Sequence, residues 1–88
     1  MEIVIGSIVR SKAGRDKGDL FVVLKCEGEY TYLANGELRK VDKPKKKKLK
    51  HLQGTNCVSG FISEKMRNVG KVTNSEVRKA LADYRPLD

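Results

Sequence analysis

The sequence predicts a mainly β fold, a small barrel or sandwich, followed by one or two short α-helices. Three observations predict it. Between residues 3 and 53, short apolar runs are separated by turn residues at close spacing, as in small all-β domains. After residue 60 the apolar spacing becomes that of a helix. The 88 residues, 39% of them hydrophobic, allow one small core. We therefore expect a β domain over residues 3–53, a linker over 54–60 and a helical extension over 61–85.

The first two predicted strands enclose a polar loop. Residues 7–11 alternate as a half-buried strand does, and residues 20–26 form an apolar run with strong β propensity. Residues 12–19 between them contain Gly14 and Gly18, which suit turns that need a positive φ. Cys26, at the end of the apolar run, is expected to behave as a small core residue.

A third strand is predicted over residues 30–34 and a fourth over residues 38–41. Asn35-Gly36 lies between them and is a strong hairpin signal, because a type I′ turn needs positive φ at both positions. Tyr30 and Tyr32 share one face of the third strand. If the residues that alternate with them face the core, both tyrosines are exposed, and the opposite assignment buries them. We favour an arrangement in which one tyrosine is partly exposed.

Two helices are predicted after the β domain. The first has apolar residues at helical spacing and a glycine placed to end it: Ile62, Met66, Val69 and Gly70. The second begins with a capping box, Thr73-Asn74-Ser75-Glu76, which Val72 and Val77 flank as in a hydrophobic staple. The second helix then carries an apolar stripe that we interpret as packing surface, made of Val77, Ala80, Leu81 and Tyr84.

The charge is strongly basic and concentrated in one stretch. A net charge of +8 indicates a polyanionic partner, which is a nucleic acid, an anionic membrane surface or an acidic protein. Residues 39–51 hold eight Lys or Arg residues and one Asp. A solvated charge run is the alternative interpretation. Leu49 and Leu52 are expected to anchor a short final strand here, with the lysines on its outer face. The candidate contacts in this stretch are Arg39, Lys40, Lys43, Lys45, Lys46, Lys47, Lys48, Lys50 and His51.

The polar loop over residues 12–19 is a second candidate contact. Arg15 and Lys17 lie between its glycines, so backbone amides and two cations there can face a phosphate together. A tight turn whose glycines serve only the backbone is an equal alternative.

Several function classes have no support in the sequence. Cys26, Cys57 and the single histidine fit no zinc motif. No arrangement of residues indicates a catalytic site, so we expect no enzyme, no cofactor and no small-molecule substrate. We expect a cytoplasmic protein without a membrane partner, because no apolar stretch reaches 18 residues and the start lacks the features of a signal peptide.

Residues 6–23, GSIVRSKAGRDKGDLFVV, resemble a KOW motif, which is a strand, a loop with a central glycine and a second strand. The chain through residue 52 and the tail over residues 74–81 are similar to small bacterial KOW-domain proteins related to the fourteen-e large-subunit ribosomal protein. The resemblance implies an SH3-like β-barrel that binds ribosomal or other structured RNA. It also implies that Gly14 holds the loop turn while four basic residues face RNA, namely Arg10, Lys12, Arg15 and Lys17.

We therefore predict an RNA-binding protein associated with ribosomes or translation. One alternative is a protein-interaction module of the SH3-like type, although the lack of Trp counts against an aromatic groove for proline-rich ligands. The other is a DNA-binding protein that uses its C-terminal helices as a helix-turn-helix, with Arg78 and Lys79 on the second helix.

Overall fold

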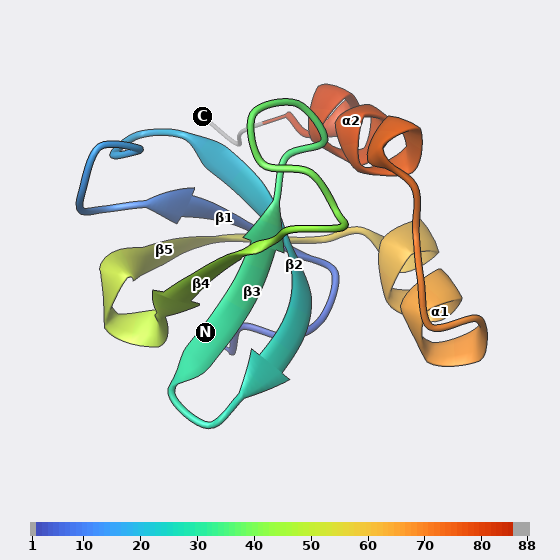
Figure 1. Ribbon diagram of the computed structural model, residues 1–88, viewed down its shortest axis with the longest axis horizontal. Helices are drawn as coiled ribbons and strands as arrows, with labels where there is room; N and C mark the ends of the chain where they lie inside the picture. Colours follow the sequence, from blue (N-terminus) through green and yellow to red (C-terminus); the bar gives the residue numbers. More distant parts are fainter. Residues whose placement is uncertain (1, 86–88) are drawn as a thin grey trace.

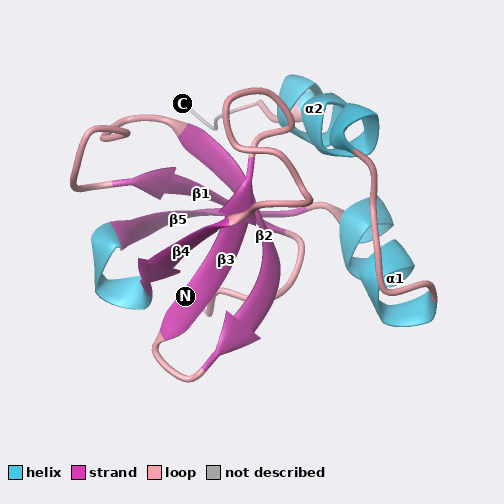
Figure 2. Cartoon of the chain, viewed as in Figure 1, coloured by secondary structure: helices cyan, strands magenta, loops and turns pink. Residues whose placement is uncertain are grey.

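The computed structural model describes residues 2–85, which form a five-stranded antiparallel sheet followed by two helices (Figures 1 and 2). The strands are β1 (Ser7–Ser11), β2 (Leu20–Glu27), β3 (Tyr30–Ala34), β4 (Lys45–Lys48) and β5 (Leu52–Val58). A 3-10 turn, Leu49–His51, separates β4 from β5, and the helices are α1 (Gly60–Asn68) and α2 (Asn74–Asp83). The prediction of a mainly β fold with C-terminal helices is confirmed.

The strand order is β4-β3-β2-β1-β5, so β4 and β5 are the two edges of the sheet. Along residues 2–85 no ladder joins these edges, and the sheet is therefore open. It is also strongly twisted, and the two helices lie together at one end of it (Figure 2). The backbone amide of Lys12 donates to the carbonyl of His51 at 2.8 Å, which places the 3-10 turn beside the loop that follows β1.

Two apolar clusters lie on opposite faces of the sheet. The inner cluster consists of Val9, Phe21, Val23, Leu33 and Leu52. The helix-facing cluster joins the other face to both helices and consists of Ile8, Val22, Leu24, Ala34, Ile62, Val72 and Val77. Successive residues of β2 alternate between the two clusters. Burial of both faces explains why β2 is apolar almost throughout.

Both predicted helices are present, although α1 begins at Gly60, within the expected linker. Ser59 caps α1 by accepting the amide of Ile62 at 3.2 Å, and Gly70 follows this helix with φ +86°. The predicted capping box of α2 is present, with Thr73 Oγ1 accepting the amide of Glu76 at 3.1 Å and Glu76 Oε1 accepting that of Thr73 at 2.8 Å. The predicted apolar stripe packs against the helix-facing cluster, as expected of packing surface.

The predicted strand over residues 38–41 is wrong. Residues 35–44 form a loop, and the strand that pairs with β3 is the lysine run itself, Lys45–Lys48. The expected type I′ turn is also absent, because Gly36 has φ +79° while Asn35 is not in the positive-φ region. Instead, the side-chain Oδ1 of Asn35 accepts the amides of Glu37 and Arg39 at 3.0 and 2.9 Å. The side chain of Asn35 thus accepts hydrogen bonds as a backbone carbonyl does in a turn. The resulting loop is longer than a two-residue hairpin turn.

Two further expectations are corrected. Most of the expected linker over residues 54–60 belongs to β5, which pairs with β1 despite its loop-like composition. This edge strand tolerates polar residues because its backbone pairs with β1. The side chain of Thr55 adds a hydrogen bond to the Ile8 carbonyl at 2.7 Å. Cys26 is exposed and is not a core residue, because β2 extends beyond the part of the sheet that the helices and the inner cluster cover.

Candidate nucleic-acid interface

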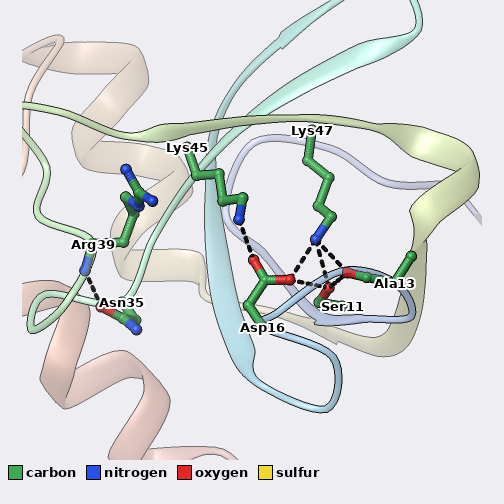
Figure 3. Close-up of polar contacts among 7 residues, drawn as sticks. All are labelled: Ser11, Ala13, Asp16, Asn35, Arg39, Lys45 and Lys47. Carbon is green, nitrogen blue, oxygen red and sulfur yellow. Dashed lines mark hydrogen bonds and ion pairs between the residues drawn. The ribbon is translucent and has the colours of Figure 1, made fainter.

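Asp16 is the centre of a polar cluster between β4 and the loop over residues 12–19 (Figure 3). Its Oδ1 accepts hydrogen bonds from Lys47 Nζ at 2.5 Å and from Ser11 Oγ at 2.7 Å. Lys45 Nζ lies 2.8 Å from Oδ2. Lys47 Nζ also donates to Ser11 Oγ at 2.7 Å and to the carbonyl of Ala13 at 2.8 Å. The cluster therefore ties the edge strand β4 to a loop about thirty residues earlier in the chain.

The ion pair at this centre is largely shielded from solvent, since the side chain of Asp16 is 12% exposed and that of Lys47 is 8% exposed. Burial by itself raises the pKa of the Asp16 carboxyl, because it penalises the charged form. The hydrogen bonds from Lys45, Lys47 and Ser11 outweigh this effect and hold the pKa well below its usual range. Asp16 is thus charged at neutral pH, and it holds the two lysines as structural partners.

The strand β4 divides its lysines between two sides. Lys45 and Lys47 lie opposite Leu33 and Thr31 of β3 and share their inward direction, so we call them the inner lysines. Lys47 is buried. The expectation that the lysines lie together on an outer face is therefore wrong for this residue, because Asp16 holds its ammonium group inside.

Lys46 and Lys48 point to the opposite side, and we call them the outer lysines. Lys46 Nζ lies 4.4 Å from the ring centre of Tyr30, and Lys48 Nζ lies 3.4 Å from Glu29 Oε1. Lys46 is exposed, and along residues 2–85 no carboxylate comes within 4.0 Å of its ammonium group. Of the four consecutive lysines, only Lys47 is buried, whereas Lys46 and Lys48 point away from Asp16.

The 12–19 loop combines internal bonds with exposed charge. The guanidinium of Arg10 donates to the Gly18 carbonyl at 2.7 Å, so this residue braces the loop. Gly14 and Gly18 have φ of +86° and +94°, where other residues are strained, so the turns of this loop favour glycine at both positions. The remaining predicted contacts of this segment are exposed, and they are Lys12, Arg15 and Lys17.

The structure brings two of the predicted arginines to one cleft. Arg15 of the 12–19 loop and Arg39 of the 35–44 loop line a hollow of about 270 Å³, which we call the loop cleft. Its complete lining is Arg15, Asp16, Asp19, Phe21, Asn35, Leu38, Arg39 and Lys45. This lining carries three cationic side chains and two carboxylates, namely Arg15, Arg39 and Lys45 with Asp16 and Asp19. The cleft is therefore cationic.

The 35–44 loop is held by α2. Arg78 Nη1 donates to the carbonyl of Gly36 at 2.7 Å, and Asn74 Oδ1 accepts the amide of Val41 at 2.8 Å. A Cβ atom at Gly36 would lie 2.5 Å from the carbonyl oxygen of Asn74, which shows how closely the loop approaches the helix. The helix thus fixes the loop that carries Arg39.

The remaining predicted contact residues lie on the 35–44 loop and in the 3-10 turn. Lys40 and Lys43 are exposed on the 35–44 loop. Lys50 is exposed and His51 is half-buried in the 3-10 turn, next to the start of the 12–19 loop. Basic residues from three separated segments therefore gather around the end of the sheet that the 12–19 loop covers.

Three functional features were missed from the sequence. Asp16 was the single acid between Arg15 and Lys17, but nothing local indicated that its partners lie on β4. Leu38, placed in a predicted strand, is 92% exposed at the rim of the loop cleft. The contact of Lys46 with Tyr30 required knowledge of which strand pairs with β3.

The structure also bears on other kinds of site. Among residues 2–85, no group of three or more His, Cys, Asp or Glu is placed to hold a metal ion. No helix in this part of the chain is long and apolar enough to cross a membrane.

The sequence matches no protein-family model, and a search of curated proteins gave no match.

Proposed function

We propose that this protein binds RNA through the phosphate groups, with the loop cleft as the principal contact. One observation carries the proposal: two arginines from loops far apart in the sequence line one cationic cleft. Guanidinium groups suit this role because their planar donors match phosphate geometry. The exposed lysines of both loops and Lys50 then supply further attraction that does not depend on sequence.

We also propose that the sheet belongs to the SH3-like barrel class and that the protein acts on ribosomal or other structured RNA. The pairing of β1 with both β2 and β5 and the enclosed inner cluster support such a barrel. The KOW-like segment supports it as well, since it spans β1, the 12–19 loop and the start of β2. The choice of RNA rather than DNA rests on this resemblance alone.

The two alternatives have weaker support. A groove for proline-rich ligands needs accessible aromatic rings. The loop cleft is not such a groove, because its one aromatic side chain, Phe21, is 2% exposed. Recognition of DNA by α2 needs free basic side chains. Arg78 is hydrogen-bonded to Gly36, and Lys79 Nζ lies 3.2 Å from Asp83 Oδ2.

The test is binding of a labelled structured RNA and of duplex DNA of equal length across a salt series. We expect tighter binding of the RNA and a steep negative slope of log affinity against log salt. Replacing both cleft arginines, Arg15→Gln with Arg39→Gln, should reduce the magnitude of that slope by roughly 1.4 to 1.8, because each phosphate contact contributes about 0.7 to 0.9.

A matched control removes two charges outside the lining of the cleft. Arg67→Gln with Lys71→Gln changes the net charge equally, and both residues are exposed near the end of α1. The control should keep the slope of the unaltered protein within error. The proposal is wrong if affinity does not depend on salt, or if both double variants reduce the slope to the same extent.

A further inference from the structure

The outer face of β3 carries two aromatic side chains outside the loop cleft. Tyr30 and Tyr32 are half-buried, while Thr31 and Leu33, which alternate with them, are fully buried. Both tyrosines therefore lie on the side away from the inner cluster. Two residues along a strand advance about 7 Å, so the rings form two neighbouring surfaces, which we call the tyrosine face.

Lysines from both neighbouring strands surround these rings. Lys25 Nζ of β2 lies 5.4 Å from the ring centre of Tyr32. Lys46 Nζ and Lys48 Nζ of β4 lie 4.4 and 5.7 Å from that of Tyr30. The outer lysines and Lys25 thus place three ammonium groups within reach of any anion that approaches the rings.

Two carboxylates share this face and reduce its charge. Glu27 Oε2 lies 3.4 Å from Lys25 Nζ, and Glu27 Oε1 accepts the Tyr32 hydroxyl at 3.3 Å. Glu29 lies 3.4 Å from Lys48. These pairs are exposed, so they are weak and solvent-screened. Lys46, over Tyr30, is the cation on this face without such a partner among residues 2–85.

The helices leave this part of the sheet uncovered. The helix-facing cluster includes Ala34 of β3 but neither tyrosine. Figure 1 shows α1 and α2 at one end of the sheet, with the β2–β3 hairpin extending away from them. The two half-buried rings and the lysines beside them therefore belong to neither apolar cluster.

We propose that the tyrosine face binds unpaired nucleotides of the RNA, whose bases stack on Tyr30 and Tyr32 while the adjacent lysines contact the phosphates. Stacking on aromatic side chains is the general way in which proteins hold unpaired bases. This inference rests on the proposed function, but it names a different surface and a different feature of the RNA. The loop cleft contacts backbone phosphate, whereas the tyrosine face distinguishes unpaired from paired nucleotides.

The test compares a blunt RNA hairpin with the same hairpin carrying an unpaired overhang of six nucleotides. The unaltered protein should bind the overhang form at least about tenfold more tightly, since stacking contributes a factor of this order for each base. Tyr30→Leu with Tyr32→Leu should abolish that difference and leave affinity for the blunt hairpin within about twofold. Tyr30→Phe with Tyr32→Phe should keep the difference, because it keeps both rings.

Intrinsic fluorescence gives a second measurement on the same complex. The chain has three tyrosines and no tryptophan, so a Tyr84→Phe protein carries its fluorophores only on the tyrosine face. The overhang RNA should quench this emission strongly and the blunt hairpin should not. This readout does not depend on whether the leucine variants fold.

The outcomes separate the two proposals. Equal binding of the two hairpins by the unaltered protein, without selective quenching, overturns the tyrosine face and leaves RNA binding intact. An equal loss of affinity for both hairpins in the leucine variant also overturns it. Binding of neither hairpin overturns the proposed function and the inference with it.

Discussion

The inner and outer lysines of β4 have the same side chain and adjacent positions, yet they have different roles. Lys45 and Lys47 reach Asp16 inside the protein, whereas Lys46 is exposed beside Tyr30. The strand alternation alone separates them. A run of like charges is therefore not a contact surface by itself, because half of this run completes the fold. An inward lysine at an edge also disfavours pairing with another sheet edge.

The largest expected difference concerns the acids that the two kinds of lysine contact. Asp16→Asn leaves the buried ammonium of Lys47 without its counter-charge and should lower the free energy of unfolding by about 3 kcal/mol. Glu29→Gln removes the exposed partner of Lys48 and should change the free energy of unfolding by less than about 0.5 kcal/mol. Urea denaturation followed by circular dichroism measures both. Equal effects of the two substitutions would mean that the inner ion pair is not structural.

The same contrast shows what the sequence could predict. The bounds of β1 and β3 and the capping box of α2 were predicted because nearby residues determine them. β4 was not, because its strand formation depends on pairing with β3 and on Asp16, 31 residues before Lys47. Lysine runs and glycine-rich segments such as β5 have low strand propensity, and tertiary pairing overrides that preference.

In the candidate site, too, the individual residues were predictable from the sequence and their arrangement in space was not. Arg15 and Arg39 were both predicted as contacts from their local context. Their common cleft depends on the 35–44 loop, which α2 holds through Arg78 and Asn74. No local sequence pattern connects a helix at the end of the chain with that loop. The cleft could therefore be recognised only from the three-dimensional structure.

A smaller difference is expected when the lysines themselves are changed. Lys47→Met keeps the buried stem but removes the donor to Asp16, which still has Lys45 as a partner. We expect a loss of about 2 kcal/mol in the free energy of unfolding. Lys46→Met should leave stability within about 0.5 kcal/mol of the unaltered protein. Thermal and urea unfolding measure both, and a greater loss for Lys46→Met would reverse the assignment of the two sides.

The smallest expected effect is the acid dependence of the inner pair. The folded-state pKa of Asp16 is depressed, so its contribution to stability is complete above the unfolded-state value, near 4. That contribution is lost as the pH falls below this value towards the lower folded-state pKa. The free energy of unfolding should therefore fall by about 1 kcal/mol at pH 3 from this group alone.

The matched comparison is the Asp16→Asn protein, measured by urea unfolding at each pH between 7 and 3. Its other carboxylates are unchanged, including Glu76, whose pKa Lys65 and Thr73 lower by hydrogen bonding in both proteins. Subtracting the two curves isolates Asp16, and the difference should shrink steadily below pH 4. Parallel curves over the whole range would show that the inner lysines do not hold the charged form of this carboxylate, and the distinction between the two sides of β4 would then rest on burial alone.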